Sequence, residues 1–223
     1  MNPNASFATL QQEPESGLQF RRIPATGEPR ARLLLLHGVG GNETNLAALA
    51  PHLPKGLEVL LLRAPLQIGP QGFAWFQVNF TANGPVIDAE QADASRQQLL
   101  RFIQALPAQP TVIGGFSQGG ILSASVGLSA PQLVAGFALL SGRILPELEA
   151  HIAAPEALRS LSAFIAHGHH DDKLPPSWAE RADAWLQRLQ VRHSSHRYDM
   201  GHEIVAEEVA DLADWLRATL TLE

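Results

Sequence analysis

The stretch Thr111-Val-Ile-Gly-Gly-Phe-Ser-Gln-Gly-Gly-Ile-Leu122 decides the fold of this chain. It begins with a β-rich run, continues with Gly115-Phe-Ser117-Gln-Gly119, and ends in residues with helical spacing. A serine on a sharp strand-to-helix turn has strained backbone angles, so the positions two before and two after it must lack colliding side chains. The pattern predicts a nucleophilic serine at position 117, although a glycine-rich turn with a surface serine also fits these five residues.

Apolar runs of strand length recur along the chain and alternate with longer segments of helical spacing. The predicted strands cover residues 18–23, 31–37, 57–63, 111–116, 134–141, 161–167 and 193–198. Several are apolar at consecutive positions, as in Arg32-Leu-Leu-Leu-Leu36, which is typical of parallel strands that are buried on both faces. The chain is therefore predicted to be an α/β protein, with a mostly parallel sheet and helices on both faces.

Three segments have the spacing of amphipathic helices. The first presents apolar residues between Leu99 and Leu106. The second opens with Ser177 and has Glu180 three residues later, which matches a capping box. The third is predicted to begin at about Glu203, with inward-facing apolar residues from Val205 to Leu220. Their apolar stripes are interpreted as parts of the core.

The composition excludes several classes of function. The 223 residues are predicted to form one domain over residues 1–223, of which about 1–16 form a flexible or loosely packed N-terminal segment. The formal net charge is −6 and no basic run is interleaved with aromatic residues, so no nucleic-acid partner is expected. The absence of cysteine excludes disulfides, thiolate metal sites and a cysteine nucleophile.

The N-terminal residues do not form a basic segment followed by an apolar one. No apolar run reaches the ~18 residues that indicate a membrane span. We therefore expect a cytoplasmic protein without a membrane span.

A serine hydroxyl is a weak nucleophile and needs an adjacent base, which in turn needs an orienting carboxylate. Asp171 follows the sixth predicted strand and His202 follows the seventh. The order Ser117, Asp171, His202 is the chain order of α/β-hydrolase triads. Asp172 remains an alternative acid because either neighbour can turn inward, whereas Asp199 is interpreted mainly as a turn or cap residue.

Two backbone N–H groups are candidates for stabilising an oxyanion. Gln118 would lie at a helix N-terminus, where N–H groups are unpaired and the helix dipole is positive. Val39 lies in the run Leu36-His-Gly-Val-Gly-Gly41 after the most apolar strand, where adjacent glycine lets the backbone turn an N–H toward a reacting carbonyl. Taken alone, that run also fits a tight turn without a catalytic role.

The segment from Pro65 to Pro85 is predicted to be a long loop, and loops of ~20 residues in compact domains are often functional. Its large apolar residues are Leu66, Ile68, Phe73, Trp75, Phe76 and Phe80. They are expected either to line a substrate pocket or to pack as a satellite core.

A metal site is the competing interpretation of the segment after the sixth strand. The spacing of His167, His169 and Asp171 occurs in binuclear metallohydrolases, where a histidine normally follows the aspartate. Here that position is Asp172, and further histidine ligands would have to compete with the triad. We therefore expect no metal and interpret His169 and His170 as solvated loop residues.

Taken together, these residues resemble the phospholipase/carboxylesterase family of serine hydrolases, which includes acyl-protein thioesterases and small bacterial carboxylesterases. The matching elements are the Leu36-His-Gly-Val-Gly40 run, Ala64-Pro65 with Trp75-Phe76, Gly115 to Gly120, Ser141-Gly142 with Pro146, His167-Gly-x-x-Asp171 with Pro175, and Gly201-His202. They cover residues from about 30 to 203.

The resemblance implies a single-domain α/β-hydrolase with a minimal lid that cleaves carboxylic esters, thioesters or lysophospholipids without a cofactor. It assigns the nucleophile to Ser117, the acid to Asp171, the base to His202, and the oxyanion donors to Val39 and Gln118. Many members of the family are dimers, so a homodimer is expected. The rival interpretation is a ligand-binding homologue that keeps the pocket and lacks the chemistry.

The expected substrate pocket contains Leu66, Phe73, Trp75, Phe76, Arg143 and Leu174. Arg143 departs from the family, whose members often have an apolar or aromatic residue after the Ser-Gly pair. Asp172-Lys173 is a second departure, at positions where a proline and an apolar residue are common. Arg143 is expected either to form a surface salt bridge or to recognise an acidic acyl or alcohol group.

Overall fold

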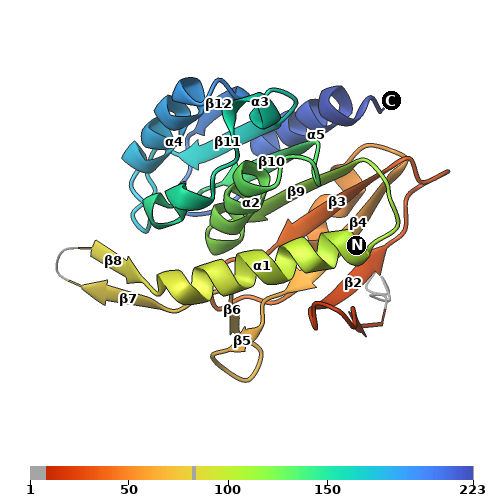
Figure 1. The fold of residues 1–223 in the computed structure, drawn as a ribbon, viewed down its shortest axis with the longest axis horizontal. Coiled ribbons are helices and arrows are strands. Elements are labelled where there is room, and N and C mark those ends of the chain that lie inside the picture. The colour runs from red at the N-terminus through yellow and green to blue at the C-terminus, as the bar shows by residue number, and fades with distance from the viewer. Residues whose placement is uncertain (1–8, 82–83, 223) are drawn as a thin grey trace.

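The computed structural model describes residues 9–81 and 84–222. Its centre is an eight-stranded sheet with the order β1-β2-β4-β3-β9-β10-β11-β12 (Figure 1). The strands are β1 (Gln11–Gln12), β2 (Gln19–Ile23), β3 (Ala31–Leu36), β4 (Leu57–Arg63), β9 (Thr111–Phe116), β10 (Gly136–Leu140), β11 (Ser162–Gly168) and β12 (Arg192–Tyr198). From β4 to β12 neighbouring strands run parallel, whereas β1 and β2 are antiparallel to their neighbours. All seven predicted strands are present, which confirms the mostly parallel sheet.

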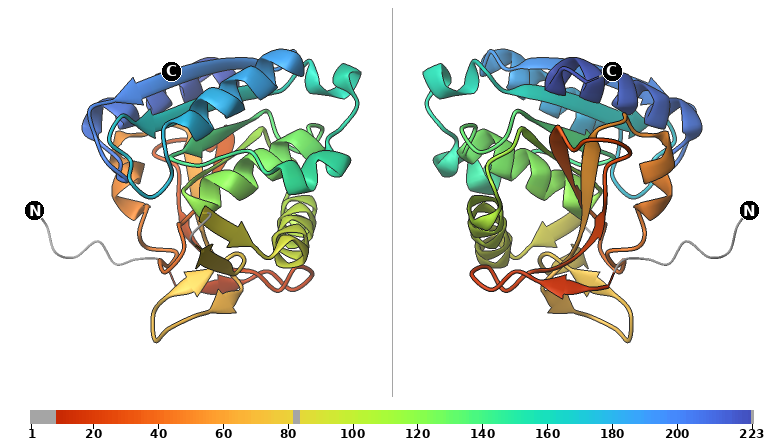
Figure 2. Two further views of the ribbon diagram at one scale, coloured as in Figure 1. Left: turned by 90° about the vertical axis from the view of Figure 1, so that its left-hand side faces the viewer. Right: turned by 90° about the vertical axis from the view of Figure 1, so that its right-hand side faces the viewer.

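Helices cover both faces of the sheet, as predicted. One face carries α1 (Ala89–Ala105), α2 (Gln118–Ser129), α3 (Pro155–Leu158), α4 (Ser177–Arg188) and the 3₁₀ helix η2 (Pro146–His151), and the other carries α5 (Ala206–Leu220) and the 3₁₀ helix η1 (Ala47–His52). Figure 2 shows η1 in orange and α1 in yellow-green on opposite sides of the sheet. Leu34 and Leu36 of β3 join one core, and Leu33 and Leu35 join the other. The consecutive apolar residues of this strand are therefore buried on both faces.

The predicted capping box at Ser177 is not formed. Ser177 is the first residue of α4, Pro176 occupies the cap position, and no side chain caps the helix. Pro176 already has helical backbone angles, with φ of −52° and ψ of −27°. A proline at this point pre-organises the first turn, so the helix begins without a side-chain cap.

Residues 66–87 form two hairpins in place of the predicted long loop. These are β5 (Leu66–Gln67) with β6 (Phe73–Ala74), and β7 (Val78–Thr81) with β8 (Gly84–Ile87). Trp75 and Phe76, which connect the hairpins, are fully buried in the main core, whereas Ile68 is 51% exposed. The Phe80 side chain lies outside the described part of the chain.

Residues 11–16, which belong to the segment expected to be flexible or loosely packed, make specific contacts in the structure. Gln11 and Gln12 pair with β2, and Glu13 and Ser16 are buried and hydrogen-bonded to each other. Residues 1–8 lie outside the described residues. No helix in the described ranges has the length and apolar character needed to cross a membrane.

The carboxyl ends of β3, β9, β10, β11 and β12 lie at one edge of the sheet because these strands are parallel and adjacent. This edge is where open α/β sheets bind ligands. The loops that leave it carry Val39, Ser117, Arg143, Asp171 and His202.

Candidate active site

Ser117 lies in the turn between β9 and α2 with backbone angles that few side chains adopt. Its φ is 55° and its ψ is −117°, and its N–H donates to the carbonyl oxygen of Leu140 at 2.8 Å. A Cβ atom on Gly115 would lie 2.6 Å from the carbonyl oxygen of Leu36, and one on Gly119 would overlap the same oxygen. Glycine at both positions therefore allows the strained turn to pack against the end of β3.

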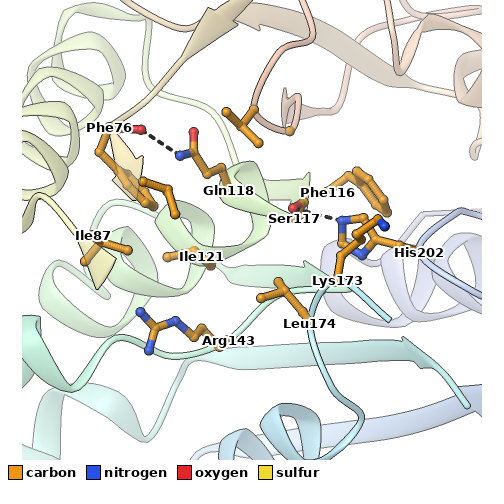
Figure 3. Close-up of a pocket in the computed structure, with 13 residues that line it drawn as sticks. Phe76, Ile87, Phe116, Ser117, Gln118, Ile121, Arg143, Lys173, Leu174 and His202 are labelled. Atoms are coloured by element: carbon orange, nitrogen blue, oxygen red, sulfur yellow. Dashed lines mark hydrogen bonds between the residues drawn. The ribbon is translucent and has the colours of Figure 1, made fainter. Parts of the chain in front are cut away.

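The side chains of Ser117, His202 and Asp171 form a continuous chain of hydrogen bonds. Ser117 Oγ lies 3.0 Å from Nε2 of His202 (Figure 3), and Nδ1 of His202 lies 2.7 Å from Oδ2 of Asp171. The other carboxylate oxygen accepts the N–H groups of Lys173 at 2.9 Å and Leu174 at 2.8 Å. Because a carboxylate only accepts, Nδ1 of His202 carries the proton and Nε2 can accept one from Ser117.

The two alternative acids point to solvent. The side chain of Asp172 is 75% exposed and pairs with Lys173 at 3.2 Å. The side chain of Asp199 is 91% exposed and pairs with His170 at 2.7 Å. Of the three acids considered from the sequence, Asp171 is the one that contacts His202.

The histidines of the alternative metal motif lie in different environments. His169 is exposed, whereas His167 is fully buried and its Nε2 donates to the carbonyl oxygen of Leu174 at 2.8 Å. Burial lowers the pKa of His167, so its ring is neutral at neutral pH. Within residues 9–81 and 84–222, no three His, Asp or Glu side chains are grouped to hold a metal ion. His167 instead holds the loop that carries Asp171, since its Nε2 also lies 3.3 Å from Oδ2 of that residue.

Val39 and Gln118 line the same cavity as Ser117 and carry the two N–H groups expected to act as oxyanion donors. Gln118 is the first residue of α2, where an N–H has no acceptor within the helix. The N–H groups of the two glycines after Val39 donate to backbone carbonyls, whereas the described residues offer no acceptor to the N–H of Val39. Among residues 9–81 and 84–222, the backbone N–H groups of these two cavity-lining residues therefore have no protein acceptor.

The side chain of Gln118 joins the serine turn to the segment between the hairpins. Its Oε1 accepts the N–H of Trp75 at 3.0 Å, and its Nε2 donates to the carbonyl oxygen of Phe76 at 2.7 Å. From the sequence we assigned a role only to the backbone of Gln118. The side-chain role was missed because its partners lie 43 and 42 residues earlier in the chain.

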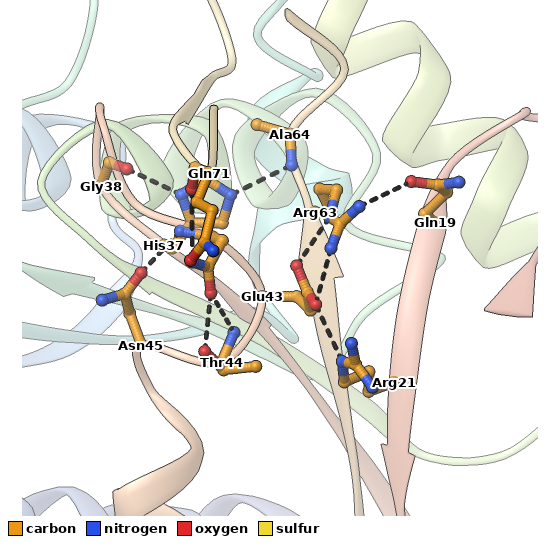
Figure 4. A network of polar contacts seen from close by, with 11 residues as sticks. Gln19, Arg21, His37, Gly38, Glu43, Thr44, Asn45, Arg63, Ala64 and Gln71 are labelled. Atoms are coloured by element: carbon orange, nitrogen blue, oxygen red, sulfur yellow. Dashed lines mark hydrogen bonds and ion pairs between the residues drawn. The ribbon is translucent and has the colours of Figure 1, made fainter. Parts of the chain in front are cut away.

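His37 braces the turn that contains Val39 (Figure 4). Its Nε2 accepts the N–H of Ala64 at 3.1 Å, so Nδ1 carries the proton and donates to the carbonyl oxygen of Gly38 at 2.7 Å. Burial lowers the pKa of His37, which keeps the ring in this neutral form. The indole Nε1 of Trp75 donates to the carbonyl oxygen of His37 at 2.9 Å.

Glu43 anchors the far end of the same loop to the sheet (Figure 4). Its carboxylate pairs with Arg21 at 2.8 Å and with Arg63 at 2.7 Å. Burial raises the pKa of Glu43, but the hydrogen bonds from Arg63 and Arg21 outweigh it and lower the pKa to about 2. The group is therefore charged at neutral pH and connects the loop to β2 and β4.

A cavity of about 220 Å³ opens at Ser117 (Figure 3). Its lining consists of Gly38, Val39, Phe76, Val78, Ile87, Phe116, Ser117, Gln118, Ile121, Arg143, Lys173, Leu174 and His202. Most of these residues are apolar, two are cations, and none is a carboxylate. The volume lies below the ~300–1,000 Å³ of typical pockets for drug-sized ligands.

Three of the six residues expected in the substrate pocket line this cavity. Phe76, Arg143 and Leu174 line the cavity, whereas Leu66, Phe73 and Trp75 do not. Trp75 is buried in the core, where its indole N–H donates to the carbonyl oxygen of His37. Phe73 lies under the Arg63 guanidinium, 4.6 Å from ring centre to Cζ, and Leu66 lines a separate surface hollow.

Val78 and Ile87, which were missed from the sequence, take the place of these three residues in the cavity. They face each other across the β7–β8 hairpin, a pairing that no local pattern revealed. Phe116 and Ile121 were missed as well, although their position next to Ser117 in the sequence was a usable signal.

The sequence model of the phospholipase/carboxylesterase family matches residues 22–220. Acyl-protein thioesterase 1 of Mycosarcoma maydis is 29% identical, over 95% of this chain and 97% of its own length. Acyl-protein thioesterase 1 of Eremothecium gossypii is 27% identical, over 91% of this chain and 94% of its own. A carboxylesterase structure from Mesorhizobium loti, 23% identical, has the same fold with a TM-score of 0.78, covering 93% of this chain and 98% of its own. The chain therefore belongs to the phospholipase/carboxylesterase family of α/β-hydrolases.

Proposed function

We propose that this chain is a serine hydrolase that cleaves carboxylic esters or thioesters through an acyl-enzyme on Ser117. The observation that carries the proposal is the hydrogen-bonded chain from Asp171 through His202 to Ser117, with distances of 2.7 Å and 3.0 Å. Ser117 and His202 line a largely apolar cavity, which adds support because an ester must bring its carbonyl carbon to the serine oxygen.

In the first half of the reaction, Nε2 of His202 accepts the hydroxyl proton as Ser117 Oγ attacks the carbonyl carbon. The N–H groups of Val39 and Gln118 donate to the developing oxyanion. Asp171 keeps His202 in the required tautomer and stabilises the imidazolium. His202 then gives its proton to the departing alcohol or thiol, which leaves an acyl group on Ser117.

In the second half, water takes the place of the leaving group. His202 accepts a proton from the water as the water oxygen attacks the acyl carbon. His202 then gives this proton to Ser117 Oγ as the bond between Oγ and the acyl carbon breaks. The products are a carboxylic acid and the free enzyme. His202 carries out every proton transfer in this scheme, and the scheme therefore requires no cofactor.

The size of the cavity favours esters with short acyl chains among the possible substrates. About 220 Å³ leaves little room for a long lipid chain. The relatives named acyl-protein thioesterase make thioesters the second substrate class to test. Lysophospholipids form the third, and we place them last because of the small cavity.

A fluorophosphonate probe tests the proposal directly. The wild-type protein should form a covalent adduct on Ser117, and Ser117→Ala should form none while remaining folded. We expect Ser117→Ala to lower kcat on a short p-nitrophenyl ester by about 10⁴- to 10⁶-fold. A folded wild-type protein that neither labels nor hydrolyses any ester would instead support the ligand-binding homologue.

We also infer that the enzyme acts in the cytoplasm and forms a homodimer. The absence of cysteine is in keeping with a reducing compartment. The dimer rests on the family resemblance alone. Cell fractionation tests the location, and analytical ultracentrifugation of the purified chain tests the dimer.

A further inference from the structure

Arg143 is a cation enclosed within the cavity that contains Ser117. It follows β10 on the segment that turns past the end of the strand, and its side chain is 7% exposed. Figure 3 shows its guanidinium on the other side of Ile121 and Leu174 from His202. The guanidinium lies over the ring of Trp178, with Cζ 4.6 Å from the ring centre. The Cζ atom of Arg181 lies 4.8 Å from the centre of the same ring.

The polar contacts of Arg143 are weak compared with those of the other buried arginines. Its nearest carboxylate is Glu147, at 3.7 Å and 38% exposed, and within the described ranges no acceptor is hydrogen-bonded to Arg143. Arg32, which is 4% exposed, pairs with a glutamate at 2.8 Å, and Arg96, which is 8% exposed, pairs with an aspartate at 2.7 Å. The expected salt bridge is therefore present with Glu147, but its separation is longer than those of the pairs formed by Arg32 and Arg96.

The rest of the cavity offers Arg143 no counter-ion. Its lining contains no carboxylate, and its other cation, Lys173, lies on the loop next to Asp171. Burial lowers the pKa of Arg143, but a guanidinium stays charged at neutral pH. A buried charge whose nearest carboxylate lies 3.7 Å away is only partly compensated, and an anion that hydrogen-bonds to it reduces the remaining penalty.

We propose that Arg143 binds a carboxylate carried by the substrate, so that the enzyme prefers short esters with one free acid group. This proposal rests on the proposed ester hydrolysis at Ser117. A guanidinium can bind a carboxylate through two parallel hydrogen bonds, which fixes the orientation of the substrate as well as its charge. Ser117 and Arg143 line the same cavity of about 220 Å³, so we expect the acid group and the ester of the substrate to lie a few methylene groups apart.

The test compares acidic and neutral esters at constant ionic strength. Monoethyl glutarate carries the acid in the acyl half and has ethyl pentanoate as its neutral counterpart. 3-Acetoxypropanoate carries the acid in the alcohol half and has propyl acetate as its counterpart. We expect kcat/KM to favour one of the acidic esters by about 10- to 100-fold, the range expected for hydrogen bonds to a charged group. The favoured pair identifies the half of the substrate that Arg143 binds.

Arg143→Gln should abolish this preference by raising KM for the acidic ester by much more than for its neutral counterpart. Arg143→Lys should restore part of the preference, because lysine keeps the charge but not the paired hydrogen bonds. Arg181→Gln is the matched control, since it removes a guanidinium from the other contact on Trp178 outside the cavity. It should leave the preference unchanged.

Glutarate binding tests the inference without catalysis. In the Ser117→Ala background, calorimetry should detect glutarate binding that weakens about tenfold or more when Arg143→Gln is added. Equal kcat/KM for acidic and neutral esters, or an equal loss on both in Arg143→Gln, would overturn the role of Arg143 and leave the ester hydrolase intact. Loss of Ser117 labelling in the wild-type protein would overturn the hydrolase itself, and the glutarate measurement would still decide whether Arg143 binds a carboxylate.

Discussion

Oδ2 of Asp171 lies 2.7 Å from Nδ1 of His202, although the two residues are 31 positions apart. They come from the loops after β11 and β12, which are adjacent parallel strands. Asp172 lies on the same loop and points to solvent. The direction in which one peptide turns therefore decides which of two consecutive carboxylates can orient the histidine.

Asp171→Asn should lower kcat on a short ester by about 10³- to 10⁴-fold, because the amide N–H favours the wrong tautomer of His202. Asp172→Asn is the control and should keep the wild-type kcat. Steady-state kinetics with circular dichroism separate a loss of chemistry from a loss of fold. Equal losses in the two variants would contradict the assignment of Asp171.

His167→Leu should lower kcat/KM by about 10- to 100-fold. The variant loses the hydrogen bond from the His167 ring to the carbonyl oxygen of Leu174, so the loop that carries Asp171 should shift by a fraction of an ångström or more. His169→Leu, at an exposed position two residues further on, is the matched control and should have little effect. The rate of fluorophosphonate labelling reports on the nucleophile independently of substrate binding. A labelling rate equal to that of the wild type would show that His167 does not position the triad.

Glu43→Gln should destabilise the fold in a pH-dependent way. The pKa of Glu43 is about 2 in the folded chain against an ordinary 4.5, so its contribution is present above pH 4.5 and is lost as the pH falls toward 2. The lowered pKa corresponds to about 3 kcal/mol of unfolding free energy at neutral pH. Urea denaturation at pH 7 should show this difference, and it should shrink steadily on acidification. A difference that is constant with pH would contradict the ion pairs with Arg21 and Arg63.

The pKa of Glu208 is shifted in the opposite direction to that of Glu43. It is fully buried in α5, and burial raises its pKa to about 8 from an ordinary 4.5, against the smaller lowering effect of a backbone hydrogen bond with Val205. The folded chain therefore holds a proton that the unfolded chain releases between these values, and the unfolding free energy falls as the pH rises from 4.5 to 8.

Glu208→Gln should remove this pH dependence. Relative to the wild type, the variant should gain about 4 kcal/mol of unfolding free energy between pH 4.5 and pH 8, where the wild type must either keep its proton or bury a charge. Glu207→Gln changes the exposed neighbour on the same helix and should gain nothing. Chemical denaturation across this pH range checks both variants, and parallel curves for Glu208→Gln and wild type would exclude a raised pKa.

Local sequence patterns were enough to predict the sheet and the order of the candidate triad. Leu33 to Leu36 are apolar at every position because both faces of β3 are covered, and this requirement is visible in the sequence itself. Gly115 and Gly119 mark the serine turn because any larger side chain there would collide with the end of β3. Burial and steric exclusion constrain the residue type at individual positions, so their effect can be recognised in a short stretch of sequence.

The pairings between distant segments were decided by the tertiary structure alone. The choice of Asp171 over Asp172, the inward position of Trp75 and the contribution of Val78 and Ile87 to the cavity all depend on which chain segment lies alongside. The environment of Arg143 is a further example. Its position in the sequence indicated a cation near the site, but only the folded chain shows that its nearest carboxylate is 3.7 Å away. Hydrogen bonds and charge pairs between remote residues have no sequence period, and only the folded chain brings the partners together.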